Sequence, residues 1–235
     1  MESARAAIRG FKETRDRHGL SNALNNAAEA FLKMGDVDSA RAASKEALEL
    51  SESAGSKSDR AKIQVTLAST LIRTQGEREK SLDLYRDALL TFRTLGDRRS
   101  EVETLVGIGD VLLDSGNSRG RGALQSSLDL AQSIGAVREV VRAQRSLGSV
   151  EGQLGQIRLA TEHLESSLAL ARRIQAAEEE ARSGDGLADV HARQGDARRA
   201  LELWKAALEI FDRLHISAQS ELVRQKIGRL GRSVH

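Results

Sequence analysis

The sequence predicts an all-α fold, a right-handed superhelical solenoid of helix-turn-helix repeats. Proline is absent and aromatic residues make up only 3% of the 235-residue chain, so Leu, Ile, Val and Ala must form the core of uninterrupted helices. Apolar residues with helical spacing flank a glycine-polar dipeptide that recurs at steps of 39 to 41 residues. This dipeptide occurs at Gly35-Asp36, Gly76-Glu77, Gly116-Asn117, Gly155-Gln156 and Gly195-Asp196.

Each of these glycines is expected to end one helix just before the next begins, because glycine adopts the left-handed C-cap conformation without strain. The predicted first helices of the pairs span 20–34, 58–75, 98–115, 137–154 and 177–194. The predicted second helices span 37–54, 78–95, 118–134, 157–174 and 197–214. Junctions between successive pairs are marked by Gly19, Gly55, Gly96-Asp97 and Gly135.

The pairs give a single solenoid domain over residues 1–235 with additional helices at both ends. The five expected repeats are 20–54, 58–95, 98–134, 137–174 and 177–214. Residues 1–18 are expected to form an orphan helix, the second helix of a pair whose first member is missing, which suggests a chain cut from something longer. Residues 217–231 mix Leu222 and Leu230 with polar residues, as expected of a capping helix that shields the last repeat.

Composition narrows the class of function. Lys and Arg total 36 against 34 Asp and Glu, and the basic pairs lack interleaved aromatic residues, so no direct nucleic-acid partner is predicted. There are no cysteines for disulfides or thiolate metal sites, which fits a cytoplasmic protein. The sequence contains neither a secretory signal nor the roughly 20 consecutive apolar residues of a membrane span, so no membrane partner is expected.

Catalytic motifs are missing from the sequence. It contains no Gly-Lys dipeptide, and therefore no phosphate-binding P-loop, and neither a nucleophile elbow nor a zinc-binding helix motif. The five histidines are too far apart for a metal site on one helix. The acidic run 178–180 opens a predicted helix, where negative charge favours the helix dipole. We therefore predict no enzyme activity, no metal and no cofactor.

Small residues recur at fixed places in each pair. One series is Ala28, Ser69, Gly109, Gly148 and Ala188, and a second is Ala47, Ala88, Ser127, Ser167 and Ala207. Bulky residues between them include Phe31, Ile72, Leu112, Tyr85, Leu164 and Trp204. This pattern resembles the tetratricopeptide repeat in a longer form of about 40 residues. Glu151 and His191 depart from the bulky pattern, and the usual proline at the end of the repeat is absent.

Within that family the chain looks like the repeat arrays of actinobacterial multidomain transcriptional regulators. The likeness lies in Leu24-Asn25-Asn26-Ala27-Ala28, in the Leu95-Gly96-Asp97 junction and in the many Arg and Ala residues. Similar long repeats occur in kinesin light chains, spindle-orientation adaptors and bacterial peptide-sensing regulators. Fold-level likeness does not choose among them.

The resemblance implies that a protein or peptide binds on a concave face lined by the first helices. The candidate residues are Asn22, Asn25, Asn26, Glu29, Lys33, Thr66, Thr70, Arg73, Glu103, Val106, Asp110, Asp114, Arg142, Arg145, Gln153, Arg182, Asp185, Asp189 and Arg193, all expected to be exposed. Asparagines would hold the peptide backbone and arginines would grip carboxylates in two-pronged fashion. The alternative for each charge is a solvated helix face with weak local pairs.

Three functional hypotheses follow from this interpretation. The chain is the sensor or scaffold part of a bacterial regulator, a free-standing adaptor, or a homo-oligomer in which residues 2–17 complete a neighbouring array. All three are binding functions, and none names the partner.

Overall fold

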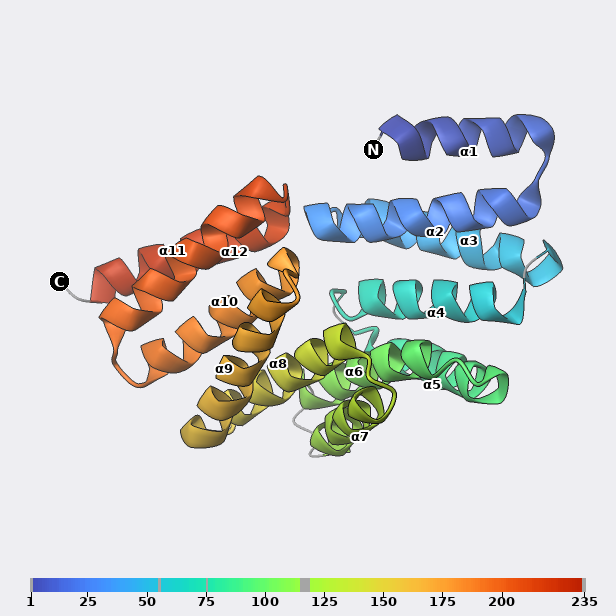
Figure 1. The fold of residues 1–235 in the computed structure, drawn as a ribbon. Helices are drawn as coiled ribbons and strands as arrows, with labels where there is room; N and C mark the ends of the chain where they lie inside the picture. Colours follow the sequence, from blue (N-terminus) through green and yellow to red (C-terminus); the bar gives the residue numbers. More distant parts are fainter. Residues whose placement is uncertain (1, 55, 75, 115–118, 234–235) are drawn as a thin grey trace. The chain divides into compact units, whose positions relative to one another are not determined.

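The computed structural model describes residues 2–54, 56–74, 76–114 and 119–233. These residues form twelve helices and no strand, which confirms the predicted all-α class (Figure 1). The helices are α1 (Glu2–Thr14), α2 (Arg17–Met34), α3 (Val37–Ala54), α4 (Lys57–Leu71), α5 (Arg78–Leu95), α6 (Arg98–Asp114), α7 (Arg119–Ser133), α8 (Val137–Gln153), α9 (Ile157–Arg173), α10 (Ala177–Arg193), α11 (Ala197–Arg213) and α12 (Ser217–Ser233).

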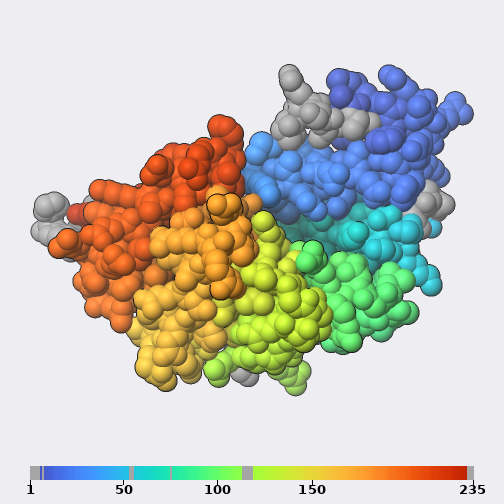
Figure 2. All heavy atoms as spheres, viewed as in Figure 1, coloured from blue at the N-terminus to red at the C-terminus, as the bar shows by residue number. Residues whose placement is uncertain are grey.

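The chain divides into two compact units, Met1–Val111 (unit 1) and Leu112–His235 (unit 2). In unit 1, α2 packs on α3, α4 packs on α5, and α1 lies against α2. Figure 2 shows the described residues of α1 in dark blue beside those of α2 in lighter blue. In unit 2, α8 packs on α9 and α10 on α11, with α12 against α11. First helices are also neighbours, since α2 contacts α4 and α8 contacts α10. The pairing within each unit is that of stacked helix-turn-helix repeats, while the count of five and the single domain stay predictions.

The turn glycines adopt the predicted left-handed conformation. Gly35, Gly76, Gly155 and Gly195 have φ of 75–82°. The aspartate that follows Gly35 or Gly195 caps the next helix, because Asp36 Oδ1 accepts from the Ser39 N–H and Asp196 Oδ1 from the Arg199 N–H, at 3.1 and 3.0 Å. Gly-Asp thus ends one helix and begins another within two residues. The predicted turn at Gly116 and the junction at Gly55 lie outside the described residues.

The first junction differs from the prediction, because Gly19 lies inside α2 rather than at its start. The left-handed residue between α1 and α2 is Arg15, with φ of 56°, and Asp16 caps α2 by accepting from the Gly19 N–H at 2.9 Å. A Cβ on Gly19 would lie 2.4 Å from the Phe11 ring. Glycine at this position therefore permits close packing of α1 on α2.

Helix α4 also differs, since it ends at Leu71 and not at residue 75. After Leu71 the backbone tightens to three-residue hydrogen bonds, from Arg73 N to Thr70 O at 3.2 Å and from Thr74 N to Leu71 O at 2.9 Å. The β-branched residues here have low helix propensity, which favours an early end. Helix α2 begins at Arg17 and not at residue 20, and all the other helices of the five pairs begin and end within one residue of the prediction.

The core consists of small residues interleaved with bulky ones. In unit 1, Ala28 and Ala47 are completely buried against Leu20, Leu24 and Ile63. In unit 2, a cluster around Trp204 and Phe211 includes Val223 of α12, so α12 covers the apolar side of the last pair. Ala28 and Ala47 of the two small-residue series are therefore buried in the core of unit 1.

Two junctions in unit 2 have no glycine, and these give a stability prediction. Gln175 and His215 are left-handed, with φ of 54° and 56°. This conformation costs an L-residue about 1–2 kcal/mol relative to glycine. We expect Gln175→Gly to raise the free energy of unfolding of unit 2 by about 1 kcal/mol, measured by urea denaturation with the fluorescence of Trp204, the only tryptophan. The reverse change, Gly155→Ala, should lower it, and a loss on Gln175→Gly would contradict the assignment.

Candidate binding sites on the first helices

Unit 1 brings five of the predicted site residues around one cavity of about 230 Å³. The predicted residues in its lining are Asn25, Asn26, Glu29, Thr66 and Glu103. The other lining residues are Lys62, Val65, Phe92, Ser100 and Thr104. Lys62 and Val65 were not predicted although they share the face of α4 that carries Thr66. Phe92 was not predicted because it belongs to α5, the second helix of its pair.

A hydrogen-bond network joins α2 and α4 at the wall of this cavity. Asn25 Nδ2 donates to Glu29 Oε1 at 3.3 Å, and Thr66 Oγ1, which donates to Lys62 O at 3.2 Å, lies 3.5 Å from the same Glu29 oxygen. Asn25 is only 7% exposed, and its Oδ1 is buried without a hydrogen-bond partner among the described residues. A buried, unpaired acceptor is uncommon in a folded protein and marks this wall as unusual.

The expected exposure of several residues was wrong. Asn25, Thr66, Thr70 and Val106 are buried, because neighbouring first helices pack directly against each other. Thr70 Oγ1 donates to Thr66 O at 2.9 Å within its own helix.

The remaining predicted residues of α2, α4 and α6 lie outside the cavity lining. Asn22 is half-buried and shares a hydrogen bond with His18 at 3.3 Å, while Lys33, Arg73 and Asp110 are exposed. The side chain of Asp114 lies outside the described residues.

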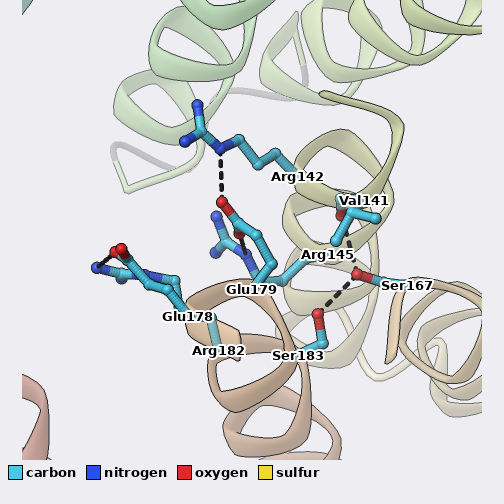
Figure 3. A network of polar contacts seen from close by, with 8 residues as sticks. All are labelled: Val141, Arg142, Arg145, Ser167, Glu178, Glu179, Arg182 and Ser183. Atoms are coloured by element: carbon cyan, nitrogen blue, oxygen red, sulfur yellow. Dashed lines mark hydrogen bonds and ion pairs between the residues drawn. The ribbon is translucent and has the colours of Figure 1, made fainter. Parts of the chain in front are cut away.

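In unit 2 the arginines expected to grip a ligand are engaged within the chain (Figure 3). Arg142 Nε donates to Glu179 Oε1 at 2.7 Å, and Arg145 Nε lies 4.0 Å from Glu179 Oε2. Glu179 is 3% exposed, so the acidic run that opens α10 supplies a buried ion-pair partner as well as charge for the helix dipole. Arg182 donates twice to Glu178 Oε1, at 3.0 and 3.2 Å.

Further contacts link the first helices of successive pairs and α12. Arg193 Nη1 donates to Gly152 O at 2.8 Å, and Lys226 Nζ donates to Asp185 Oδ1 at 2.6 Å and to Asp189 Oδ2 at 2.9 Å. The partners lie 37 or 41 residues apart, close to the repeat period. Gln153 is exposed at the end of α8. Most of the predicted charged residues in unit 2 therefore contact a neighbouring first helix or α12.

Buried hydroxyl and carboxylate groups complete this packing. Ser167 Oγ of α9 donates to Val141 O at 2.9 Å and shares a hydrogen bond with Ser183 of α10 at 2.7 Å (Figure 3). Glu151, which departs from the bulky pattern, is 1% exposed and lies 3.3 Å from Arg121 Nη2. A buried carboxylate paired with a half-exposed arginine thus occupies a place where the repeat pattern expects a bulky residue.

Burial and nearby charge shift two pKa values at the end of unit 2. Burial, with a smaller contribution from Asp185, raises the pKa of Asp189 despite the opposing charge of Lys226. Burial opposes the charged form of Lys226, but the two aspartates outweigh it and raise the pKa of this ammonium. A raised lysine pKa stabilises the fold fully below the unfolded pKa near 10.4, and this stability is lost as the pH rises through the folded value.

We therefore expect Lys226→Met to lower the free energy of unfolding of unit 2 by about 1–2 kcal/mol near pH 7, because two aspartates lose their shared donor. The loss should be smaller at pH 4 than at pH 7, because the raised pKa makes Asp189 take up a proton at a higher pH than a free aspartate does. Urea denaturation followed by Trp204 fluorescence at both pH values measures this. Lys205→Met, at an exposed position on α11, is the control. An equal loss at both pH values would rule out the charge effect.

Two classes of site find no support in the described part of the chain. The described residues contain no group of three or more His, Asp or Glu that could hold a metal ion. Within the same residues, each helix is too short or too polar to cross a bilayer.

Comparison with known proteins identifies the repeat. The tetratricopeptide repeat model matches residues 21–53. A search of curated proteins finds no match. Among solved structures, a Rap protein complexed with Competence and Sporulation Factor is 14% identical with a TM-score of 0.72, over 99% of this chain and 69% of that chain.

Two further structures share the fold. The Rap conjugation gene regulator of plasmid pLS20, in complex with the Phr* peptide, is 13% identical with a TM-score of 0.77, over 93% of this chain and 61% of that chain. A signal transduction ATPase with a tetratricopeptide repeat sensor, from Pyrococcus horikoshii, is 17% identical with a TM-score of 0.67, over 98% of this chain and 40% of that chain. Residues 21–53 therefore match the tetratricopeptide repeat, and the chain has the fold of TPR-like helical repeat proteins.

Proposed function

We propose that this chain is a peptide- or protein-binding module that acts as the sensor or scaffold part of a cytoplasmic regulator, and that its ligand binds at the cavity of unit 1. The observation that carries the proposal is the cavity wall formed by Asn25, Asn26, Glu29, Thr66 and Glu103. Five polar residues from three first helices converge there, as a binding site requires.

The comparisons support a peptide as the ligand. Two neighbours of the same fold are Rap proteins in complex with the Competence and Sporulation Factor and with the Phr* peptide. A third carries its repeats as a sensor. Repeat scaffolds of this kind are generally non-catalytic, which agrees with the missing motifs of the sequence.

The chemistry of the cavity also favours a peptide over a compact small molecule. Its volume of about 230 Å³ is below the roughly 300–1,000 Å³ of drug-sized ligand pockets, so it suits one side chain of a longer ligand. Asn26 is exposed at the rim, where its amide can pair with both the N–H and the C=O of a peptide backbone.

A peptide-display selection tests this function. A phage library of random peptides of about 12 residues is selected against the immobilised chain, and enriched peptides are measured by fluorescence anisotropy. We expect Asn26→Ala to weaken binding about fivefold, as loss of a hydrogen bond does. Asn22→Ala, one turn earlier on α2 and outside the cavity, is the matched control. An unenriched library, or equal effects of the two variants, would reject the proposal.

Two measurements distinguish a multidomain regulator from a free-standing adaptor and from a homo-oligomer. An immunoblot of source cells showing a band several times heavier than 25.5 kDa supports a multidomain regulator, whereas a band at that mass supports a free-standing adaptor. Light scattering of the purified chain addresses the third hypothesis, because a strictly monomeric mass removes the homo-oligomer.

A further inference from the structure

We propose that the cavity of unit 1 accepts a guanidinium group, so that the chain recognises its peptide through an arginine side chain. This inference rests on the proposed peptide-binding function and adds the chemistry of the recognised group.

The charge of the lining favours a cation. Glu29 of α2 and Glu103 of α6 place two carboxylates at the cavity, against a single ammonium, that of Lys62 on α4. An anionic group entering this space would meet two like charges. A cation that enters this space is attracted by both carboxylates, which are exposed on α2 and α6.

The amide of Asn25 supplies a second, independent indication. Its Nδ2 donates to Glu29, while Oδ1 is buried without a partner among the described residues. The wall of the cavity therefore holds an amide oxygen and a carboxylate, both of them acceptors, and the amide oxygen has no donor among the described residues. A ligand that brings several N–H groups to this wall supplies donors for both.

A guanidinium fits this arrangement better than an ammonium. It has five N–H donors in a fixed plane, whereas a lysine ammonium has three and is more strongly hydrated. Polar residues of α2, α4 and α6 line the cavity, so a group with several donors can reach more than one of them. The apolar residues Val65 and Phe92 in the lining can contact the aliphatic stem of an arginine.

A titration of the full chain with short synthetic peptides tests the inference. The probes are an acetylated, amidated pentapeptide with arginine between pairs of alanines, and the same peptide with citrulline, a neutral analogue of nearly the same shape. Binding is followed by NMR on the side-chain amide of Asn25 near physiological ionic strength. We expect the arginine peptide to bind at least tenfold more tightly, because charge-assisted hydrogen bonds are lost with citrulline. Equal affinities would overturn the inference.

Charge-removing variants localise the effect. Glu29→Gln and Glu103→Gln should each weaken the arginine peptide about tenfold and leave the citrulline peptide unchanged. Glu49→Gln, at an exposed position on α3 outside the cavity, should change neither. If Glu29→Gln behaves like Glu49→Gln, the inference fails. The citrulline comparison on the unaltered chain decides the matter should a cavity variant not fold.

Further comparisons identify the source of the guanidinium and distinguish the guanidinium site from the peptide-binding function. If free L-arginine amide shifts the Asn25 signal as strongly as the peptide does, the cavity chemistry stands and the ligand is a small guanidine compound. If display-selected peptides bind but the arginine probes do not shift Asn25, the peptide-binding function stands and the guanidinium site is rejected. If neither binds, both proposals are rejected.

Discussion

Replacement of Arg142 with Met is expected to lower the free energy of unfolding of unit 2 by about 2–3 kcal/mol. Arg142 donates to Glu179 at 2.7 Å, and Glu179 is almost completely buried, so the variant leaves a carboxylate away from water. Arg145 lies 4.0 Å from the other oxygen and compensates only in part. We therefore place the loss below the 3–5 kcal/mol typical of a buried pair broken on one side.

A double-mutant cycle separates this explanation from a ligand-binding role for Arg142. Glu179→Met added to Arg142→Met should recover most of the loss, because an apolar pair of similar volume replaces the buried charge at little cost. Arg138→Met, at an exposed position on the same helix, is the matched control. Trp204 fluorescence during urea denaturation gives the stabilities. A loss no larger than that of Arg138→Met would show that Arg142 is available to a ligand.

Replacement of Gly148 with Ala is expected to lower the stability of unit 2 by about 1–3 kcal/mol through overpacking. An added Cβ would lie 2.6 Å from Leu164 Cγ and 3.0 Å from the Ala160 carbonyl oxygen. The side chain can move, but the backbone oxygen belongs to the facing helix α9. The two helices must therefore separate, and this loss outweighs the higher helix propensity of alanine.

Gly184→Ala, in the same unit, is a matched control for which the opposite change in stability is expected. A Cβ there would meet no other atom of the described chain within 4 Å. Gly184→Ala should therefore raise the stability by about 1 kcal/mol, the difference in helix propensity. The same denaturation experiment measures both variants. Effects of equal sign would show that helix contact does not require glycine at residue 148.

The turns could be predicted because their signal is local. Gly35, Gly155 and Gly195 end helices, since only glycine adopts the left-handed conformation at no cost and an aspartate or amide follows at once. Residue 19 is also a glycine, but for a different reason: the absence of a side chain allows close contact with Phe11. Gln175 and His215 turn the chain without glycine. A glycine in the sequence therefore indicates a turn only where it is not required for close packing of helices.

By itself the sequence determined the helical class, the period and the small residues at helix contacts, since these depend on spacing along the chain. The tertiary structure decided which polar residues remain available to a ligand. Arg142 and Asp185 have partners 37 and 41 residues away, which the stacking of successive pairs brings together. Asn25 and Glu29 meet Thr66 for the same reason. Burial and ion pairing depend on the register between helices, and this register is a property of packed side chains over the whole unit.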